Sequence, residues 1–85
     1  MIEIWSDPGC WACVKARELL DKRRVEYHEL ILEKDFLIKE ALEKFPQFAS
    51  NTALLGIQFP IVVIDGVPRG GLDFLADYLG GWFKK

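Results

Sequence analysis

The fold is decided by residues 2–20, which read IEIWSDPGCWACVKARELL. Residues 2–5 favour a β-strand, and the Ser-Asp-Pro-Gly run at 6–9 is a dense turn signal. From Cys10 to about residue 23 the chain consists of good helix formers, with apolar residues at helical spacing. The stretch therefore predicts a strand, a tight turn and a helix, with a Cys-x-x-Cys pair at the start of the helix.

Outward from this unit, the chain predicts alternating short strands and helices without a linker, a repeat or a low-complexity segment. Strands are expected at 25–32, 59–64 and 67–69, helices at 34–45 and 72–79, and an irregular helical turn within 47–58. Pro46 should end the second helix, Asp65-Gly66 should form a hairpin turn, and Gly80-Gly81 should end the last helix.

The order of these elements predicts the topology. A right-handed βαβ crossover would make the first two strands parallel, and the hairpin would add an antiparallel pair. Pro68 cannot donate a hydrogen bond to a central ladder, so the last strand should lie at an edge. The predicted fold class is α/β, a small mixed four-stranded sheet flanked by three helices, in a single domain over residues 1–85.

The composition supports one small soluble domain. The 85 residues are 51% hydrophobic, which is enough apolar material for a core, and the net charge of −2 argues against binding to nucleic acid. No apolar run approaches the ~18 residues that span a bilayer, and the N-terminus lacks the pattern of a secretory signal. We therefore expect a cytoplasmic monomer with neither nucleic acid nor a membrane as its partner.

The chain has two cysteines, Cys10 and Cys13, and one histidine, His28. This count excludes a disulfide-dense scaffold, and a closed structural zinc site would need four ligands, so no metal site is expected. A redox pair in a reducing compartment and a structural disulfide remain. A structural disulfide would be inefficient here, because so short a loop removes little entropy from the unfolded chain.

The position of the pair favours redox chemistry with unequal roles. A sulfur at the N-cap faces the free N–H groups of the first turn, here those of Ala12 and Cys13, and the positive end of the helix dipole, and both favour a thiolate at Cys10. Positions i and i+3 share a helix face, so the sulfurs can form a disulfide with little backbone motion. We expect Cys10 to attack a substrate disulfide and Cys13 to resolve the mixed disulfide.

Three motifs give the chain a resemblance to the glutaredoxins, which are thioredoxin-fold dithiol oxidoreductases, and it looks most similar to their short phage and bacterial forms. The motifs are Cys10-Trp11-Ala12-Cys13 with its helix, Phe59-Pro60, and Gly70-Gly71-Leu72-Asp73, and they extend over nearly the whole chain. The resemblance implies an enzyme that reduces protein and glutathione mixed disulfides, with glutathione as co-substrate and no bound cofactor. It also makes ribonucleotide reductase a candidate recipient of the electrons.

The resemblance further implies a substrate site around these motifs. Pro60 would be cis and lie beside the cysteines, leaving the backbone N–H and C=O of Phe59 to pair with an extended substrate. Gly71 belongs to the element with which the family holds the γ-glutamyl end of glutathione, and the backbone N–H groups of Leu72 and Asp73 would meet its carboxylate. The Asp73 side chain would take an ammonium group, cap the helix, or do both.

One position departs from the family pattern next to the redox motif. Asp7 stands where many glutaredoxins have a lysine, which removes a cation that would favour the Cys10 thiolate and attract glutathione. Arg17 is either a partial substitute for that lysine or a solvated side chain.

The role of Trp11 and the function of the protein as a whole each have alternatives. Trp11 is interpreted as an exposed docking surface for protein substrates, with ordinary packing as the alternative, and core or sheet packing is assigned to Trp5, His28 and Phe48. The missing lysine favours a redoxin recharged by thioredoxin reductase. A dimer could also hold a [2Fe–2S] cluster through Cys10 of each chain and two glutathiones, although the bulk of Trp11 beside the sulfur disfavours it.

Overall fold

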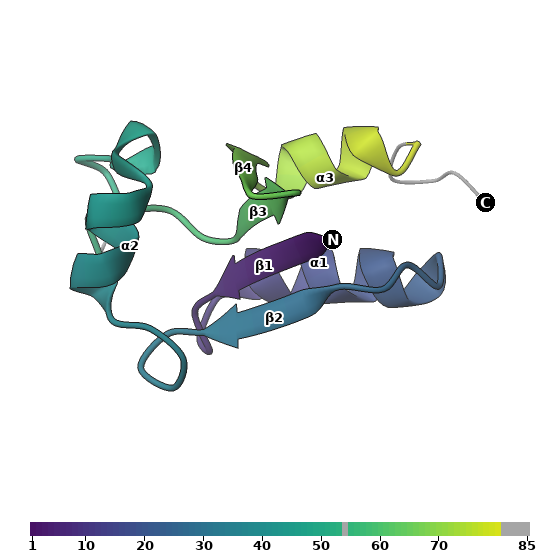
Figure 1. Ribbon diagram of the computed structural model, residues 1–85, viewed down its shortest axis with the longest axis horizontal. Coiled ribbons are helices and arrows are strands. Elements are labelled where there is room, and N and C mark those ends of the chain that lie inside the picture. The colour runs from purple at the N-terminus through teal and green to yellow at the C-terminus, as the bar shows by residue number, and fades with distance from the viewer. Residues whose placement is uncertain (54, 81–85) are drawn as a thin grey trace.

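Within residues 1–53 and 55–80, which the computed structural model describes, four strands form one mixed sheet in the order β2 (His28–Ile31), β1 (Ile2–Ser6), β3 (Ile61–Ile64) and β4 (Val67–Gly70). β1 runs parallel to β2 and antiparallel to β3, and β3 runs antiparallel to β4. The predicted crossover, the hairpin and the edge position of the strand that contains Pro68 are therefore confirmed (Figure 1).

Helices cover both faces of this sheet, as the predicted fold class requires. α1 (Trp11–Lys22) and α3 (Leu72–Tyr78) pack together on one face, and α2 (Ile38–Lys44), followed by the 3-10 turn η1 (Pro46–Phe48), packs on the other. In Figure 1, α2 stands at the end of the molecule toward which β1 and β2 point. Across the described residues, none of the helices has the length and apolar character that a bilayer span requires.

Alternate residues of β1 enter two different hydrophobic clusters, because successive side chains of a strand point to opposite faces. Ile4 is fully buried and packs with Leu20 of α1 and Leu75 of α3. Trp5 points the other way and meets Phe45 at the end of α2, with ring centroids 5.0 Å apart in an edge-on arrangement. β1 is thus packed on both faces, and the turn that follows it begins at a buried strand end.

β2 and α2 are shorter than predicted. β2 begins at His28 rather than at residue 25, and α2 begins at Ile38 rather than at 34. The segment between them folds into a tight turn, in which the Asp35 carboxylate accepts the Ile31 N–H at 2.8 Å and Glu33 has a φ of 71°. These local hydrogen bonds compete with a helical ladder, and helix propensity alone does not reveal them.

The irregular segment after α2 contains the helical turn that the sequence suggested. Pro46 ends α2 and begins η1, as predicted, and an isolated bridge between Ala49 and Ile57 closes the loop that follows. β3 then begins at Ile61 rather than at residue 59. Gly80 follows α3 with a φ of 97°, and Gly81, the second residue of the predicted helix stop, lies outside the described residues.

The three aromatic side chains that the sequence assigned to packing behave differently. Trp5 lies in the core, and Phe48 is half-buried against the same cluster. His28 pairs with Glu3 in the sheet, but its side chain is exposed rather than packed.

Candidate active site

Cys10 is the N-cap of α1, and its sulfur makes the capping hydrogen bond. It has an extended backbone (φ −91°, ψ 117°), and its Sγ accepts the N–H of Cys13 at 3.2 Å. Of the two donors expected from the sequence, the structure records this bond from Cys13 and none from Ala12. A sulfur in this place gains from the unpaired first-turn N–H groups and from the positive end of the dipole, and both favour its thiolate.

The turn before Cys10 is held by Asp7. The Asp7 carbonyl accepts the Cys10 N–H at 3.0 Å, and its carboxylate accepts the Gly9 N–H at 3.2 Å. The side chain that stands in place of the family's lysine therefore has a structural task in this chain. It fixes the turn that aims the Cys10 sulfur.

Cys13 differs from Cys10 in its exposure to solvent. Its side chain is buried, with 2% of its surface exposed, whereas Cys10 is half-buried. Burial is the main cause that raises the pKa of the Cys13 thiol to about 12, and the neighbouring Cys10 sulfur raises it further. Both cysteines are free thiols in the structure, and they are unequal as nucleophiles: one is accessible at a helix N-terminus and the other is buried and protonated.

The Phe59–Pro60 peptide bond is cis, as the resemblance implied, and Pro60 is buried. The neighbouring carbonyl is not free, however. The Cys10 thiol donates to the Phe59 oxygen across 3.4 Å, so the acceptor expected to await a substrate is occupied by the nucleophile itself in the dithiol form. This contact joins two segments 49 residues apart and places the sulfur directly beside the cis-proline loop.

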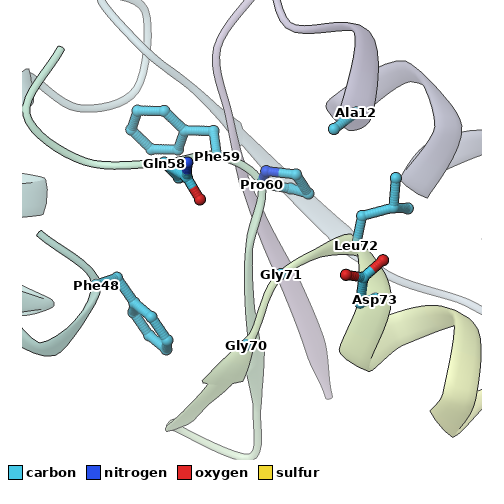
Figure 2. Close-up of a pocket in the computed structure, with 9 residues that line it drawn as sticks. All are labelled: Ala12, Phe48, Gln58, Phe59, Pro60, Gly70, Gly71, Leu72 and Asp73. Carbon is cyan, nitrogen blue, oxygen red and sulfur yellow. The ribbon is translucent and has the colours of Figure 1, made fainter. Parts of the chain in front are cut away.

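A groove of about 390 Å³ opens next to this loop (Figure 2). It contains five of the predicted substrate-site residues, together with three that the sequence did not assign to the site and one, Ala12, that lies between the cysteines. Its lining residues are Ala12, Phe48, Gln58, Phe59, Pro60, Gly70, Gly71, Leu72 and Asp73. Phe48 and Gln58 lie across the groove from Leu72 and Asp73 (Figure 2). Phe48 enters the groove from η1, and none of the three sequence motifs includes it.

A second groove of similar volume is lined by Cys10. Cys10, Asp7, Leu55 and Ile57 line it, and it shares Ala12, Gln58 and Phe59 with the first groove. Cys10 therefore lines the second groove, beside residues that the two grooves share. Among the described residues, neither groove is lined by a lysine or an arginine.

Gly71 is needed where α3 approaches the cis-proline loop. A Cβ at this position would lie 3.3 Å from the Pro60 carbonyl oxygen, which belongs to rigid backbone. Gly71 is the N-cap of α3, and no side chain caps the helix, so the alternative role of Asp73 as a cap is wrong. Asp73 is exposed in the first turn and leaves its carboxylate available at the groove. Leu72 beside it is half-buried.

Trp11 and Arg17, the two other residues singled out by sequence, lie outside both grooves. Trp11 is 69% exposed, so the alternative of ordinary packing is wrong, and the Lys15 ammonium lies 5.8 Å from its ring centroid. Arg17 pairs with Glu29 at 3.5 Å and borders a smaller cavity behind Cys13, so it does not replace the family's lysine in either groove. Within the described residues, no cluster of three or more metal-binding side chains occurs.

A thioredoxin-like sheet with a Cys-x-x-Cys pair at a helix start, beside a cis-proline, defines the thiol–disulfide oxidoreductases as the class of protein. A model of the glutaredoxin family matches residues 2–68, and the chain belongs to the glutaredoxin family. The match includes the cysteine pair and the cis-proline but ends before Gly71. None of the curated proteins compared with the chain matches it.

Solved structures agree with this family. The solution structure of glutaredoxin from Brucella melitensis is 27% identical, with a TM-score of 0.66 over 87% of this chain and 72% of that one. The thioredoxin-like protein BC3987 is 28% identical, with a TM-score of 0.60 over 93% and 99%. Glutaredoxin 1 from Francisella tularensis, solved with cacodylate, is 23% identical with a TM-score of 0.60 over 87% and 85%, and it supports the fold alone.

The unequal burial of the two thiols predicts unequal alkylation. Near neutral pH a thiolate-specific reagent should label Cys10 well before Cys13, because a thiol with a pKa of about 12 is a thiolate in only about one molecule in 10⁵ at pH 7. Mass spectrometry of peptides after brief labelling measures the ratio. In the Cys10→Ser variant, Cys13 should stay slow until the protein is unfolded. Equal labelling of the two sulfurs in the folded protein would contradict this asymmetry.

The exposure of Trp11 predicts that it contributes little to stability. Trp11→Ala should change the free energy of unfolding by less than about 1 kcal/mol, whereas Phe45→Ala, which deletes a buried ring, should cost about 3–5 kcal/mol. Denaturant titration measures both. If Trp11 docks protein substrates, the same variant should reduce a protein disulfide several-fold more slowly. A loss of stability comparable to that of Phe45→Ala would show that Trp11 belongs to the core.

Proposed function

We propose that this member of the glutaredoxin family is a dithiol enzyme that takes electrons from glutathione and reduces protein and glutathione mixed disulfides. The observation that carries the proposal is the pairing of a half-exposed N-cap sulfur with a buried second thiol on the next turn. The half-exposed Cys10 sulfur can reach a substrate, whereas burial protects the Cys13 thiol until the second exchange step.

The reaction has two exchange steps. In the first, the Cys10 thiolate attacks one sulfur of the substrate disulfide; the Cys10–substrate bond forms, and the other half leaves as a thiolate that takes a proton. In the second, Cys13 loses its proton and attacks Cys10 Sγ, which releases the reduced substrate and leaves a Cys10–Cys13 disulfide. Two glutathione molecules then restore the dithiol and become glutathione disulfide, so two electrons are conserved throughout.

The groove beside Pro60 fits the glutathione half of a mixed disulfide. Unpaired N–H groups at the start of α3 can receive its γ-glutamyl carboxylate, and the exposed Asp73 carboxylate can receive its ammonium group. The backbone of Phe59 can pair with its central peptide bonds. Gly71 supports this arrangement because it lets α3 approach the Pro60 carbonyl.

The charge of the grooves favours a second candidate reductant. Glutathione is an anion, and the described lining residues of both grooves include acids but no lysine or arginine. An enzyme recharged by thioredoxin reductase would not depend on a cation at this place. The two hypotheses share the Cys10–Cys13 dithiol and differ only in whether glutathione or thioredoxin reductase supplies its electrons.

The partners and the location follow from the same proposal. A working dithiol requires a reducing compartment such as the cytoplasm, and a monomer suffices because one chain supplies both sulfurs. Ribonucleotide reductase as a recipient of the electrons rests on the family resemblance alone.

The test is a coupled assay with matched cysteine variants. The oxidised wild-type protein is offered glutathione with glutathione reductase, or thioredoxin reductase, and consumption of the nicotinamide cofactor is recorded. We expect turnover with glutathione. Cys13→Ser should keep turnover of a glutathione mixed disulfide and lose reduction of protein disulfides, whereas Cys10→Ser should lose both. Turnover with thioredoxin reductase alone would assign the second donor, and activity in Cys10→Ser would overturn the dithiol mechanism.

Asp7 allows the effect of charge to be separated from that of the turn. Asp7→Asn keeps a side-chain acceptor for the Gly9 N–H and removes the charge, and Asp7→Lys reverses it. An exposed charge contributes roughly 0.2–1 kcal/mol, so Asp7→Lys should raise glutathione-dependent turnover several-fold and Asp7→Asn less. The gain should shrink as salt is added.

The matched control for net charge is Glu26→Lys, at an exposed position before β2. It makes the same change in total charge and should leave turnover unaltered. If Asp7→Asn, which keeps the turn, and Asp7→Lys both behave like Glu26→Lys at low salt, the carboxylate does not act on the site, and the missing lysine carries no information about the reductant.

A further inference from the structure

The Ser6 side chain is buried without a partner. Ser6 ends β1 with 2% of its surface exposed, and its carbonyl accepts the Leu32 N–H at 2.8 Å, so its backbone is satisfied. Its hydroxyl oxygen, in contrast, has no hydrogen-bond partner at ordinary geometry among the described residues. Folded proteins pair most of their buried hydroxyls, because an unpaired one is destabilising. The exception needs an explanation.

The hydroxyl lies next to the buried cysteine. Ser6 and Cys13 border the same small cavity of about 160 Å³, together with Asp7, Arg17 and Glu29. Burial has the largest effect on the pKa of the Cys13 thiol and raises it, whereas hydrogen bonding from the Asp7 backbone and, to a smaller degree, from the nearby Ser6 hydroxyl lowers it. The Cys13 N–H donates to the Cys10 sulfur and not to Ser6. Because the Ser6 hydroxyl has no other partner among the described residues, its O–H can turn toward the Cys13 sulfur.

We propose that Ser6 is a positioning residue for the resolving step, in which its hydroxyl donates a hydrogen bond to the Cys13 thiolate as that sulfur attacks Cys10. The inference rests on the proposed dithiol function. The proton of Cys13 passes to water at the cavity. The Cys13–Cys10 bond then forms while the bond between Cys10 and the substrate breaks, and the substrate leaves as a thiolate that takes a proton from solvent.

The charged side chains around Cys13 do not supply such a donor, and the one other group that lowers its pKa by hydrogen bonding is the Asp7 backbone. Asp7, after β1, and Glu29, on β2, are carboxylates that oppose a nearby thiolate. Arg17, on α1, is paired with Glu29 at 3.5 Å. Cys10, the remaining titratable neighbour, is bound to substrate when the step occurs. A neutral hydroxyl stabilises the thiolate without introducing a charge that would hold Cys13 ionised at rest.

The test is the reaction of the reduced protein with Ellman's reagent, an aromatic disulfide whose released thiolate is coloured. The first equivalent of colour appears when Cys10 attacks, at a rate that rises with reagent concentration. The second appears when Cys13 resolves the mixed disulfide, at a rate independent of that concentration. The two phases report the two sulfurs separately in one experiment.

Ser6→Thr and Ser6→Val form a matched pair, since they add the same bulk and differ only in the hydroxyl. The second phase should slow about tenfold in Ser6→Val and in Ser6→Ala, the size expected for a hydrogen bond to a charged group. It should stay within about threefold of wild type in Ser6→Thr. Its pH dependence should move to higher pH only where the hydroxyl is lost, and the first phase should change much less.

The outcomes separate the inference from the function on which it rests. A wild-type protein that releases only one equivalent, like Cys13→Ser, would overturn the dithiol function and the role of Ser6 with it. A wild type that releases two, with Ser6→Ala equally fast or with Thr and Val slowed alike, would overturn the role of Ser6 alone. Ser6→Ala removes an unpaired buried hydroxyl and should be at least as stable as wild type, so a slower step in it cannot come from unfolding.

Discussion

The site depends on how the chain turns from β1 into α1. The turn is closed by the Asp7 carbonyl and side chain, and it delivers Cys10 to the helix N-cap, where its sulfur accepts the Cys13 N–H. In the proposed mechanism, the atom that caps the helix is therefore also the nucleophile. A sulfur that reacts leaves its cap weakened, and a thiolate strengthens it, so the chemistry and the stability of the first helical turn are linked through one atom. β1, buried on both faces, keeps this turn in place.

The second constraint is the approach of two distant backbones to that turn. The cis-proline loop meets Cys10 through the Phe59 carbonyl, and α3 meets the same loop at Gly71, where a Cβ would press on the Pro60 oxygen. Neither contact is local in sequence. Both follow from the central position of β3, which pairs with β1 and leads directly to the hairpin and α3. The grooves are therefore a product of the sheet order rather than of any one motif.

The sequence was sufficient for the four strands, the parallel pair of β1 and β2, the hairpin of β3 and β4, and the position of the cysteine pair, because each has a clear signal: β-forming runs, a crossover helix, a hairpin turn, and helical spacing. It did not predict the antiparallel pairing of β1 with β3 that joins the two halves of the sheet. It was not sufficient where local hydrogen bonds or long-range contacts decide. The turn around Asp35 shortened α2, and the occupied carbonyl of Phe59 depends on a residue 49 positions away. Asp7 was interpreted by its charge, whereas its hydrogen bond to Gly9 shows why an acid suits this turn better than a lysine.

In the dithiol form, the Phe59 carbonyl accepts the Cys10 thiol at the place where the backbone N–H of an extended substrate would also pair. A backbone carbonyl has two lone pairs, so a substrate N–H can either share the Phe59 oxygen with the thiol or replace it. Once Cys10 is joined to a substrate through a disulfide it has no S–H to donate, so the Phe59 oxygen is released for the substrate backbone. The same carbonyl therefore has one partner in the free dithiol and another in the mixed disulfide of the proposed reaction, and it changes partner in the step that changes the bond at Cys10.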